Sequence, residues 1–366
     1  MSDTSAEFAP PASFEWLRDE IADLERSRDA ASRELLWADE GHRLAVSRDP
    51  RGAVELFLPG PPLEPVLPQV SAKLDHDAWT TKGGEPLAAS RIVLPDAPHF
   101  DAVAAFLAAE LLERGLVDDR EGAFRATEPI IALAISRAEI QNQVLLGLVG
   151  ELVALLALVR AAPSAAAAEI VGGWAGSFRS NRDLQVRTVG VEVKTTTGAA
   201  SHHHIQSPLQ VTLGHARDGQ PETALYLLSL GIRWQPSGSG AGMTLPELVE
   251  DLLARLPSED GEDLLARIKQ YGGDAATGYD HARDRLRSRY RHPFRLTFER
   301  LYDVVGDDLR LPQVSDFDSM SAVDAATVSF EVNLPPQVRG DRNPVVGLPD
   351  ISRTVLAESA VGVRQA

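Results

Sequence analysis

The chain has 366 residues, 44% of them hydrophobic, so it is long enough for two domains, or one large domain with an extension, and it can bury a sizeable core. It contains no cysteine, which excludes disulfides and thiolate zinc sites and fits a reducing cytosol. The net charge of −17 argues against a nucleic-acid partner unless positive charge is gathered locally, because neutralising phosphates requires lysine or arginine.

Residues 1–126 predict a small α+β N-terminal region. The spacing of apolar residues over Glu15–Leu36 predicts a helix, and the alternating runs on either side of Asp49–Gly52 predict a β-hairpin. The proline-rich stretch Leu58–Gln69 then predicts an irregular connection, and Pro98–Arg114 predicts a second helix. The first residues are acidic and lack the basic and apolar blocks of a signal peptide.

Residues 127–236 predict the order helix, strand, strand, helix, strand. The elements are a long helix over Ile131–Arg160, strands near Asp183–Arg187 and Val191–Thr195, a short helix in Ser207–Asp218 and a buried strand in Glu222–Trp234. The longest apolar stretch, Val144–Val159, has about 16 residues and is shorter than the roughly 20 that span a bilayer. We therefore expect a cytoplasmic protein with no membrane partner.

Residues 243–366 predict an α+β C-terminal region, which follows the glycine- and serine-rich joint Ser237–Gly242. Its predicted elements are helices at Leu245–Leu256 and Asp263–Tyr271 and strands near Arg295–Val305 and Thr327–Asn333. Between them, His281–Arg300 holds seven arginines and two acids. This stretch is either a stripe that faces a phosphate backbone, with Arg287 and Arg291 as contacts, or a solvated helix face.

The strand around Glu192 carries the first chemical signal. Glu192 and Lys194 share one face of this strand, because alternate side chains of a strand point to the same side. If Thr188–Gly190 forms the turn of an antiparallel hairpin, Asp183 lies roughly opposite Lys194 on that face. Two close carboxylates repel each other, and a divalent cation removes that penalty. The alternatives are an exposed Glu192–Lys194 ion pair and a turn at Asp183.

Two carboxylates and a backbone carbonyl suffice for Mg²⁺, which takes hard oxygen ligands and keeps several waters. A lysine beside them can orient or deprotonate a water, which is what hydrolysis of a phosphodiester requires.

The long helix adds a third acid, Glu151. Gly147, Gly150, Glu151 and Ala154 form one stripe of small residues with a single carboxylate in it. Small residues let a helix approach a sheet closely, and the carboxylate then points into the contact, where it must be paired or bound to metal. The alternative is that Glu151 reaches a solvent edge.

Other polar residues lie near these acids in the sequence. Ser207 and Gln210 fit a capping box, and Gln210 can also contact the site. Of His202–His204, only the first and third can share an ion, and we favour a position near the substrate for His204. Arg179 and Arg182 either contact phosphate or pair with surface acids. We expect Trp174 in the core or at a hinge.

The sequences GLVGEL, RDLQ, VEVKTT and SPLQV, which span about Ile140–Val211, together resemble the motifs of the PD-(D/E)XK nuclease superfamily. They are most similar to the bacterial PD-(D/E)XK motif proteins found among restriction and phage-defence genes, and the C-terminal pattern is similar as well. The resemblance implies an α/β fold with a restriction-endonuclease-like core, in which a central mixed sheet is flanked by helices. The α+β N-terminal region, which matches the family only loosely, and the α+β C-terminal extension complete the predicted fold. The resemblance also implies Mg²⁺-dependent cleavage of DNA in anti-phage defence, with Mn²⁺ as a substitute.

The resemblance assigns roles to individual residues. Asp183 and Glu192 match the metal-binding acids, Lys194 the lysine of the motif, Glu151 the acid of the first helix, and Gln210 the glutamine of the following helix. The carbonyl of Val193 is the expected third ligand. The proline that names the motif is replaced here by Arg182.

We expect a homodimer, because cutting both strands requires two sites. The chain contains no G-x-x-x-x-G-K-[ST] motif, so any translocation would come from an ATPase partner of the same defence system, and a methyltransferase partner is also possible. The rival hypotheses are a non-catalytic nucleic-acid-binding or scaffold subunit that keeps the nuclease fold, and a nuclease-fold enzyme for RNA or branched DNA.

Overall fold

The structure is a computed structural model that describes residues 13–29, 32–50, 52–80, 84–95, 100–178, 180–235, 242–273, 278–306, 308–340 and 342–361. The chain divides into two compact units, Met1–Asn142 and Gln143–Ala366, here called the N-terminal and C-terminal units. The boundary falls inside helix α4 (Arg120–Ala161), so this helix contributes to both. The three-part division at residues 126 and 236–243 stays a prediction.

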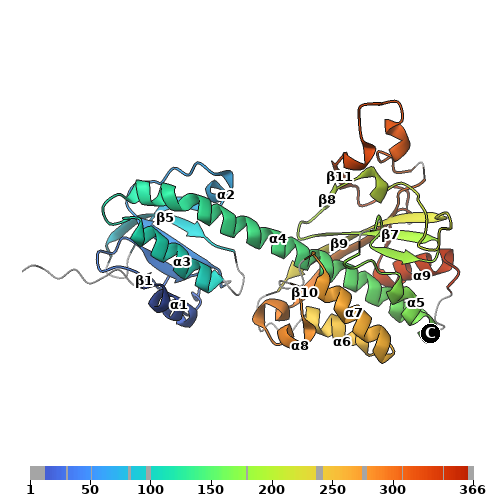
Figure 1. The fold of residues 1–366 in the computed structure, drawn as a ribbon, viewed down its shortest axis with the longest axis horizontal. Coiled ribbons are helices and arrows are strands. Elements are labelled where there is room, and N and C mark those ends of the chain that lie inside the picture. Colours follow the sequence, from blue (N-terminus) through green and yellow to red (C-terminus); the bar gives the residue numbers. More distant parts are fainter. Residues whose placement is uncertain are drawn as a thin grey trace, which may run out of the picture. The chain divides into compact units, whose positions relative to one another are not determined.

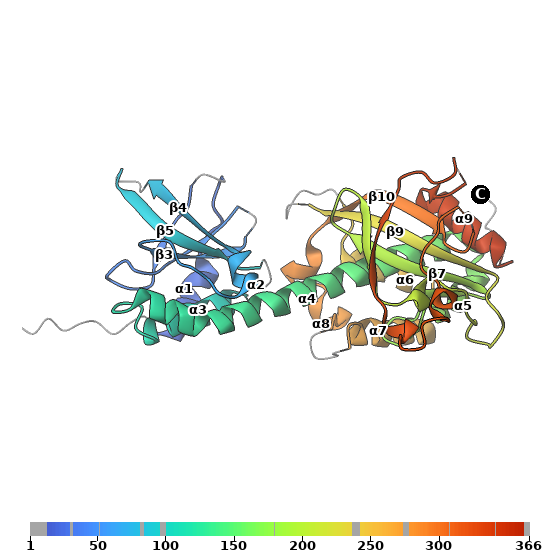
Figure 2. The ribbon, with the colours of Figure 1, turned by 90° about the horizontal axis from the view of Figure 1, so that it is seen from above.

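The N-terminal unit is built on a five-stranded antiparallel sheet in the order β1-β2-β3-β5-β4. Its elements are α1 (Phe14–Asp23), β1 (Leu36–Trp37), β2 (Ala45–Arg48), β3 (Val54–Pro59), α2 (Pro68–Ser71), β4 (Leu74–Thr80), β5 (Pro86–Val93), α3 (Phe100–Glu113) and the first part of α4. Helices α1, α3 and α4 pack their apolar side chains on one face of the sheet (Figure 2).

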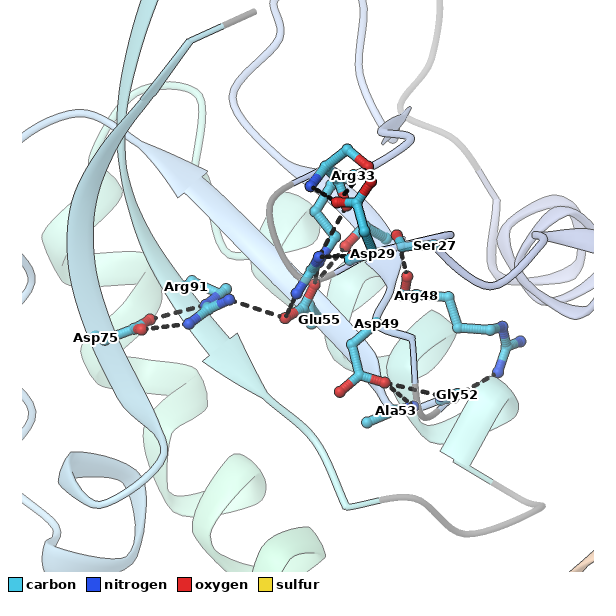
Figure 3. Close-up of polar contacts among 12 residues, drawn as sticks. Ser27, Asp29, Arg33, Arg48, Asp49, Gly52, Ala53, Glu55, Asp75 and Arg91 are labelled. Carbon is cyan, nitrogen blue, oxygen red and sulfur yellow. Dashed lines mark hydrogen bonds and ion pairs between the residues drawn. The ribbon is translucent and has the colours of Figure 1, made fainter. Parts of the chain in front are cut away.

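Local turn chemistry makes the β2–β3 hairpin, as the sequence predicted. The carboxylate of Asp49 accepts the backbone N–H groups of Gly52 at 2.7 Å and Ala53 at 2.8 Å, and Gly52 has a φ of 105° (Figure 3). Helix α3 confirms the predicted helix Pro98–Arg114. The predicted helix Glu15–Leu36 is wrong beyond Asp23. There the chain leaves the helix, and Ser27 donates its N–H and hydroxyl to the carbonyl of Arg48 in β2.

The other face of this sheet carries a buried carboxylate, Glu55, whose charge is matched by two arginines (Figure 3). Arg33 forms an ion pair with Glu55, Arg91 donates to it at 3.0 Å, and Ser47 donates its hydroxyl at 2.8 Å. Arg91 is held in turn by Asp75. A buried carboxylate needs such partners, so removing one member of this network should destabilise the N-terminal unit.

The C-terminal unit holds a mixed five-stranded sheet in the order β12-β10-β9-β7-β6, in which only the β7–β9 pair is parallel. A second sheet pairs β8 with β11. The strands are β6 (Leu184–Val186), β7 (Val189–Thr196), β8 (Ser201–Ile205), β9 (Ala224–Trp234), β10 (Phe294–Asp303), β11 (Phe330–Leu334) and β12 (Val345–Val346). The helices are the second part of α4, α5 (Ala167–Gly172), α6 (Leu245–Leu253), α7 (Ser258–Gln270), α8 (His281–Asp284) and α9 (Leu348–Glu358).

The mixed sheet lies between two layers. Side chains from α4, α5, α6, α7 and α9 form the core on one face, and β8 and β11 cover the other (Figure 1). This arrangement bears out the predicted mixed sheet flanked by helices. The predicted helix in Ser207–Asp218 is reduced to one 3₁₀ turn, η2 (Pro208–Gln210). Residues 237–241 of the predicted joint lie outside the described residues.

Helix α4 is longer than predicted because it continues through Pro129, which is exposed. The missing N–H of a proline is tolerated where the carbonyl it leaves free can reach water. By length and composition, Asn142–Ala161 is long and apolar enough to cross a membrane, which corrects the expectation that this stretch is too short, but 61% of it is buried inside the structure. There it forms the central helix of the C-terminal unit.

Candidate active site

A tight turn sets the geometry of the β6–β7 hairpin. Leu184 pairs with Val191, and Val186 pairs with Val189, so only Arg187 and Thr188 form the turn, with Arg187 at a φ of 51°. The predicted turn, Thr188–Gly190, begins one residue later than the observed one. The observed register therefore brings Asp183 beside Glu192 rather than opposite Lys194.

Four of the predicted site residues, Asp183, Glu192, Lys194 and Gln210, meet at the end of the β6–β7 hairpin that lies away from the turn. The Oδ2 atom of Asp183 accepts the N–H of Val193 at 2.7 Å. The Oε1 atom of Glu192 lies 2.9 Å from the Nζ of Lys194 and accepts the Nε2 of Gln210 at 2.6 Å. The other amide atom of Gln210, Oε1, lies 3.3 Å from Lys194. The glutamine therefore links the acid and the amine.

Gln210 also has a structural role. Its Oε1 atom accepts the N–H of Gln206 at 2.9 Å, while the hydroxyl of Ser207 accepts the N–H of Leu209 at 3.2 Å. The predicted capping box is thus shifted by one residue, and Gln210 both caps the turn and contacts the site.

Burial and mutual repulsion work against the charges of these acids. Burial, and after it the nearby charge of Asp183, raises the pKa of Glu192 to about 8 against the opposing effect of Lys194. Burial likewise raises the pKa of Asp183, although its hydrogen bond from Val193 lowers it. The fold therefore places Asp183 and Glu192 close together without enough positive charge from the protein to balance two ionised carboxylates.

The donor set fits a hard divalent cation. Among the described residues, neither the Oδ1 atom of Asp183 nor the Oε2 atom of Glu192 accepts a hydrogen bond. In a strand, the N–H and C=O of one residue face the same side, so the carbonyl of Val193 faces Asp183. Strand β6 begins only at Leu184, whose partner is Val191, so no residue of β6 pairs with Val193 on that side. Two carboxylate oxygens and one carbonyl suffice for Mg²⁺, which keeps waters in its remaining positions.

Glu151 reaches this region from α4. Its two oxygens accept hydrogen bonds from the indole N–H of Trp174, at 2.7 Å, and from the hydroxyl of Tyr271. Burial holds the pKa of Glu151 well above its usual range, and the charge of Asp183 adds to this shift. The sequence placed Trp174 in the core, where the structure also finds it, but nothing in the sequence pointed to Tyr271 at the end of α7.

Small residues bring α4 against β7, as the stripe in the sequence suggested. A Cβ atom at Gly150 would lie 1.9 Å from the Oγ1 of Thr195, and one at Gly147 would lie 2.9 Å from the hydroxyl of Tyr271. Across the described parts of the chain, no three acidic or histidine side chains are grouped to hold a metal ion by themselves. Glu151 is thus a neighbour of the two free carboxylate oxygens, and its role as a metal ligand stays a prediction.

Arg182 does not contact phosphate in this arrangement, which corrects one of our expectations. Its guanidinium is buried and forms an ion pair with buried Glu222 at 2.6 Å. Arg179 lies outside the described residues, so its predicted phosphate contact has no structural counterpart here.

The arginine-rich stretch is not a single helix. It comprises α8, the 3₁₀ turn η3 (Ser288–Arg291) and the start of β10. Arg287 is exposed and lies 3.1 Å from the buried carboxylate of Asp284, and Arg291 is exposed as well. Both remain predicted contacts to DNA.

The three histidines of β8 alternate between the two faces of the strand, as expected. His204 is exposed and pairs with Glu331 of β11 at 3.1 Å, so its predicted role near the substrate stays a prediction. His203 is buried and hydrogen-bonds to the hydroxyl of Ser229 at 2.7 Å. Ser229 is the cross-strand neighbour of Lys194. Burial, with a contribution from Lys194, lowers the pKa of His203 to about 4.

Comparison with known families supports this description. Residues 133–309 match the model of a family described as "Putative PD-(D/E)XK family member, (DUF4420)". The match includes the acids, the lysine and the glutamine of the site, and it confirms the resemblance to the PD-(D/E)XK superfamily. No curated protein and no solved structure matches the chain.

The C-terminal unit therefore has the restriction-endonuclease-like, nuclease-type fold of the PD-(D/E)XK superfamily. Within it, the part that matches the family model carries two acids, an amine and an amide at the end of one strand pair.

Proposed function

We propose that the protein is a Mg²⁺-dependent endodeoxyribonuclease that acts in the cytoplasm as part of a restriction or anti-phage system. The observation that supports this most strongly is the pair of carboxylate oxygens, one on Asp183 and one on Glu192, that accept no hydrogen bond from the described residues and lie near the ammonium of Lys194. Asp183, Glu192 and the carbonyl of Val193 would hold the ion. When bound, Mg²⁺ supplies an acidified water and neutralises charge that develops on the phosphate.

The protein side chains have separate tasks in this proposal. Lys194 orients the attacking water, since its Nζ lies at the acid that would bind the metal. Gln210 fixes the lysine and the acid relative to each other through its two amide atoms. Glu151, held by Trp174 and Tyr271, would keep a water or a second ion in place. Arg287 and Arg291 would contact the DNA backbone.

The assembly follows from the chemistry of the substrate. Cutting a duplex needs one site for each strand, so we propose a homodimer. Translocation or protection of host DNA would come from an ATPase or a methyltransferase of the same system.

Plasmid cleavage tests the proposal. In Mg²⁺ the protein should nick or linearise supercoiled DNA, and chelator should stop the reaction. Lys194→Met should abolish cleavage with no loss of DNA binding. Lys269→Met is the matched control, because Lys269 is exposed and pairs with Asp280 away from these residues, and it should cleave normally.

Metal and DNA binding separate the enzyme from a scaffold. The wild-type protein should bind Mn²⁺, and Asp183→Asn should weaken that binding. A protein that binds DNA but neither binds Mn²⁺ nor cuts under any metal would contradict the enzyme and favour the non-catalytic subunit. Arg287→Glu and Arg291→Glu should weaken DNA binding, whereas Arg353→Glu, on the exposed side of α9, should not.

A further inference from the structure

Arg182 occupies the place of the proline that names the motif, and all five of its N–H donors are used. Arg182 is only 5% exposed. The five acceptors are Glu222 Oε1 at 2.9 Å, Glu222 Oε2 at 2.6 Å, and the carbonyls of Thr212 at 2.6 Å, Leu209 at 2.7 Å and Asn181 at 2.7 Å. An arginine has five donors in a fixed planar fork, so this contact set leaves the group one orientation.

These contacts join the segments that carry the site. Arg182 directly precedes Asp183, and its acceptors Leu209 and Thr212 lie on either side of Gln210. The carboxylate of Glu222 extends the link, because it also accepts the N–H of Gly214 at 2.7 Å.

The same ion pair lies directly against β7. A Cβ atom at Gly190 would be 2.7 Å from both the Nε of Arg182 and the Oε1 of Glu222. Gly190 is two residues before Glu192, so the pair reaches the strand that carries the acid and the lysine. The residue at position 190 must be glycine for this approach, since any side chain would displace the pair.

We propose that Arg182 and Glu222 act as positioning residues, a buried brace that fixes Asp183 against Val193 and Gln210 against Glu192. A buried ion pair contributes little net stability compared with packed apolar residues, whereas it does impose a fixed geometry. The proposal rests on the proposed function for its purpose, but the geometry it predicts can be measured without any cleavage.

The N–H of Val193 reports the position of Asp183, because it donates to the Oδ2 of that carboxylate. We expect Arg182→Met and Glu222→Gln to speed hydrogen exchange at this amide by about tenfold or more, since one hydrogen bond contributes free energy of this order. The amides of Leu228 and Leu230 in β9 should change much less. Arg182→Lys, which keeps the charge but not the fork, should give an intermediate rate.

A destabilised control separates positioning from general loosening. Leu252→Ala removes a fully buried apolar side chain of α6, so it should lower the stability of the C-terminal unit. In this variant, hydrogen exchange at the amide of Val193 should speed up by the same factor as exchange at the amides of β9. If Arg182→Met does not fold, Gly190→Ala tests the same point by adding one methyl against the ion pair.

Hydrogen exchange at the amide of Val193 decides whether the brace exists. Faster exchange at Val193 than in β9 supports the brace, and an equal acceleration at Val193 and in β9 overturns it. Mn²⁺ binding by the wild-type protein is measured separately, and its absence would contradict the proposed function without altering the result for the brace.

Discussion

The charge of Glu192 destabilises the metal-free fold, and removing it should stabilise the protein. Glu192 is 2% exposed, and burial raises its pKa from 4.5 to about 8. Between these two values the folded protein retains a proton that the unfolded chain has released. The free energy of unfolding therefore falls as pH rises through this window, and the stability present below pH 4.5 is lost by about pH 8.

The size of the effect follows from the same shift. One pKa unit corresponds to about 1.4 kcal/mol, so at pH 7 the group lowers stability by about 3 kcal/mol at most. Glu192→Gln carries no charge in either state, and its amide oxygen can replace Oε1 as the acceptor for Gln210 and Lys194. We expect the variant to gain about 1–3 kcal/mol at pH 8 and little or nothing at pH 5.

The assay must report each unit separately. Guanidinium unfolding in chelator at pH 5 and pH 8, followed by a pulse of hydrogen exchange, gives the transition of the C-terminal unit from peptides of β9 and that of the N-terminal unit from β3. Glu55→Gln is the matched control, for which the change in the free energy of unfolding should have the opposite sign. It removes a buried carboxylate that compensates two arginines, so it should destabilise the N-terminal unit.

Two results would refute this reasoning. One is a Glu192→Gln variant that is less stable than the wild type at pH 8 in chelator. The other is a gain of equal size at both pH values, which would mean that the carboxyl group does not titrate in this window. Mg²⁺ should stabilise the wild type and should have little effect on the variant, because binding to the folded state adds to stability.

Two further changes test the packing around the site. Gly150→Ala should lower the stability of the C-terminal unit by about 1–3 kcal/mol, because its Cβ would overlap the hydroxyl of Thr195. Gly172→Ala is the control and should not destabilise the unit, because nothing lies within 4 Å of its Cβ position. Equal melting temperatures of the two variants would exclude this close approach of α4 to β7. His203→Gln should reduce the loss of stability that the wild type shows as the pH is lowered. In the folded wild type His203 stays neutral until about pH 4, whereas in the unfolded chain it takes up a proton near pH 6.5, so the wild type loses stability as the pH falls below 6.5. If the wild type and the variant lose the same free energy of unfolding between pH 7 and pH 4.5, this prediction is contradicted.

Local patterns in the sequence were enough for elements that form through local contacts. The β2–β3 hairpin follows from the turn chemistry of Asp49 and Gly52, and α3 from its apolar spacing. Helix α1 ended early because Ser27 bonds to Arg48 of another element, a contact that no local pattern contains. Helix α4 ran further because an exposed Pro129 can be tolerated.

The site was predictable in composition and less so in register. Strand alternation placed Glu192 and Lys194 on one face, and the small residues of α4 indicated its close approach to β7. The two-residue turn at Arg187 shifted Asp183 toward Glu192, since backbone conformation at a single residue sets the pairing. The partners Tyr271 and Glu222 arrive from distant segments that carry no motif, so only the folded structure reveals them.

The most direct test of the central claim is a crystal structure of the protein with Mn²⁺, read by its anomalous scattering. We predict one peak within about 2.2 Å of the free oxygens of Asp183 and Glu192 and of the carbonyl of Val193, with Lys194 beside it. Mn²⁺ at full occupancy elsewhere and none between these two carboxylates would contradict the proposed metal centre, and with it the nuclease.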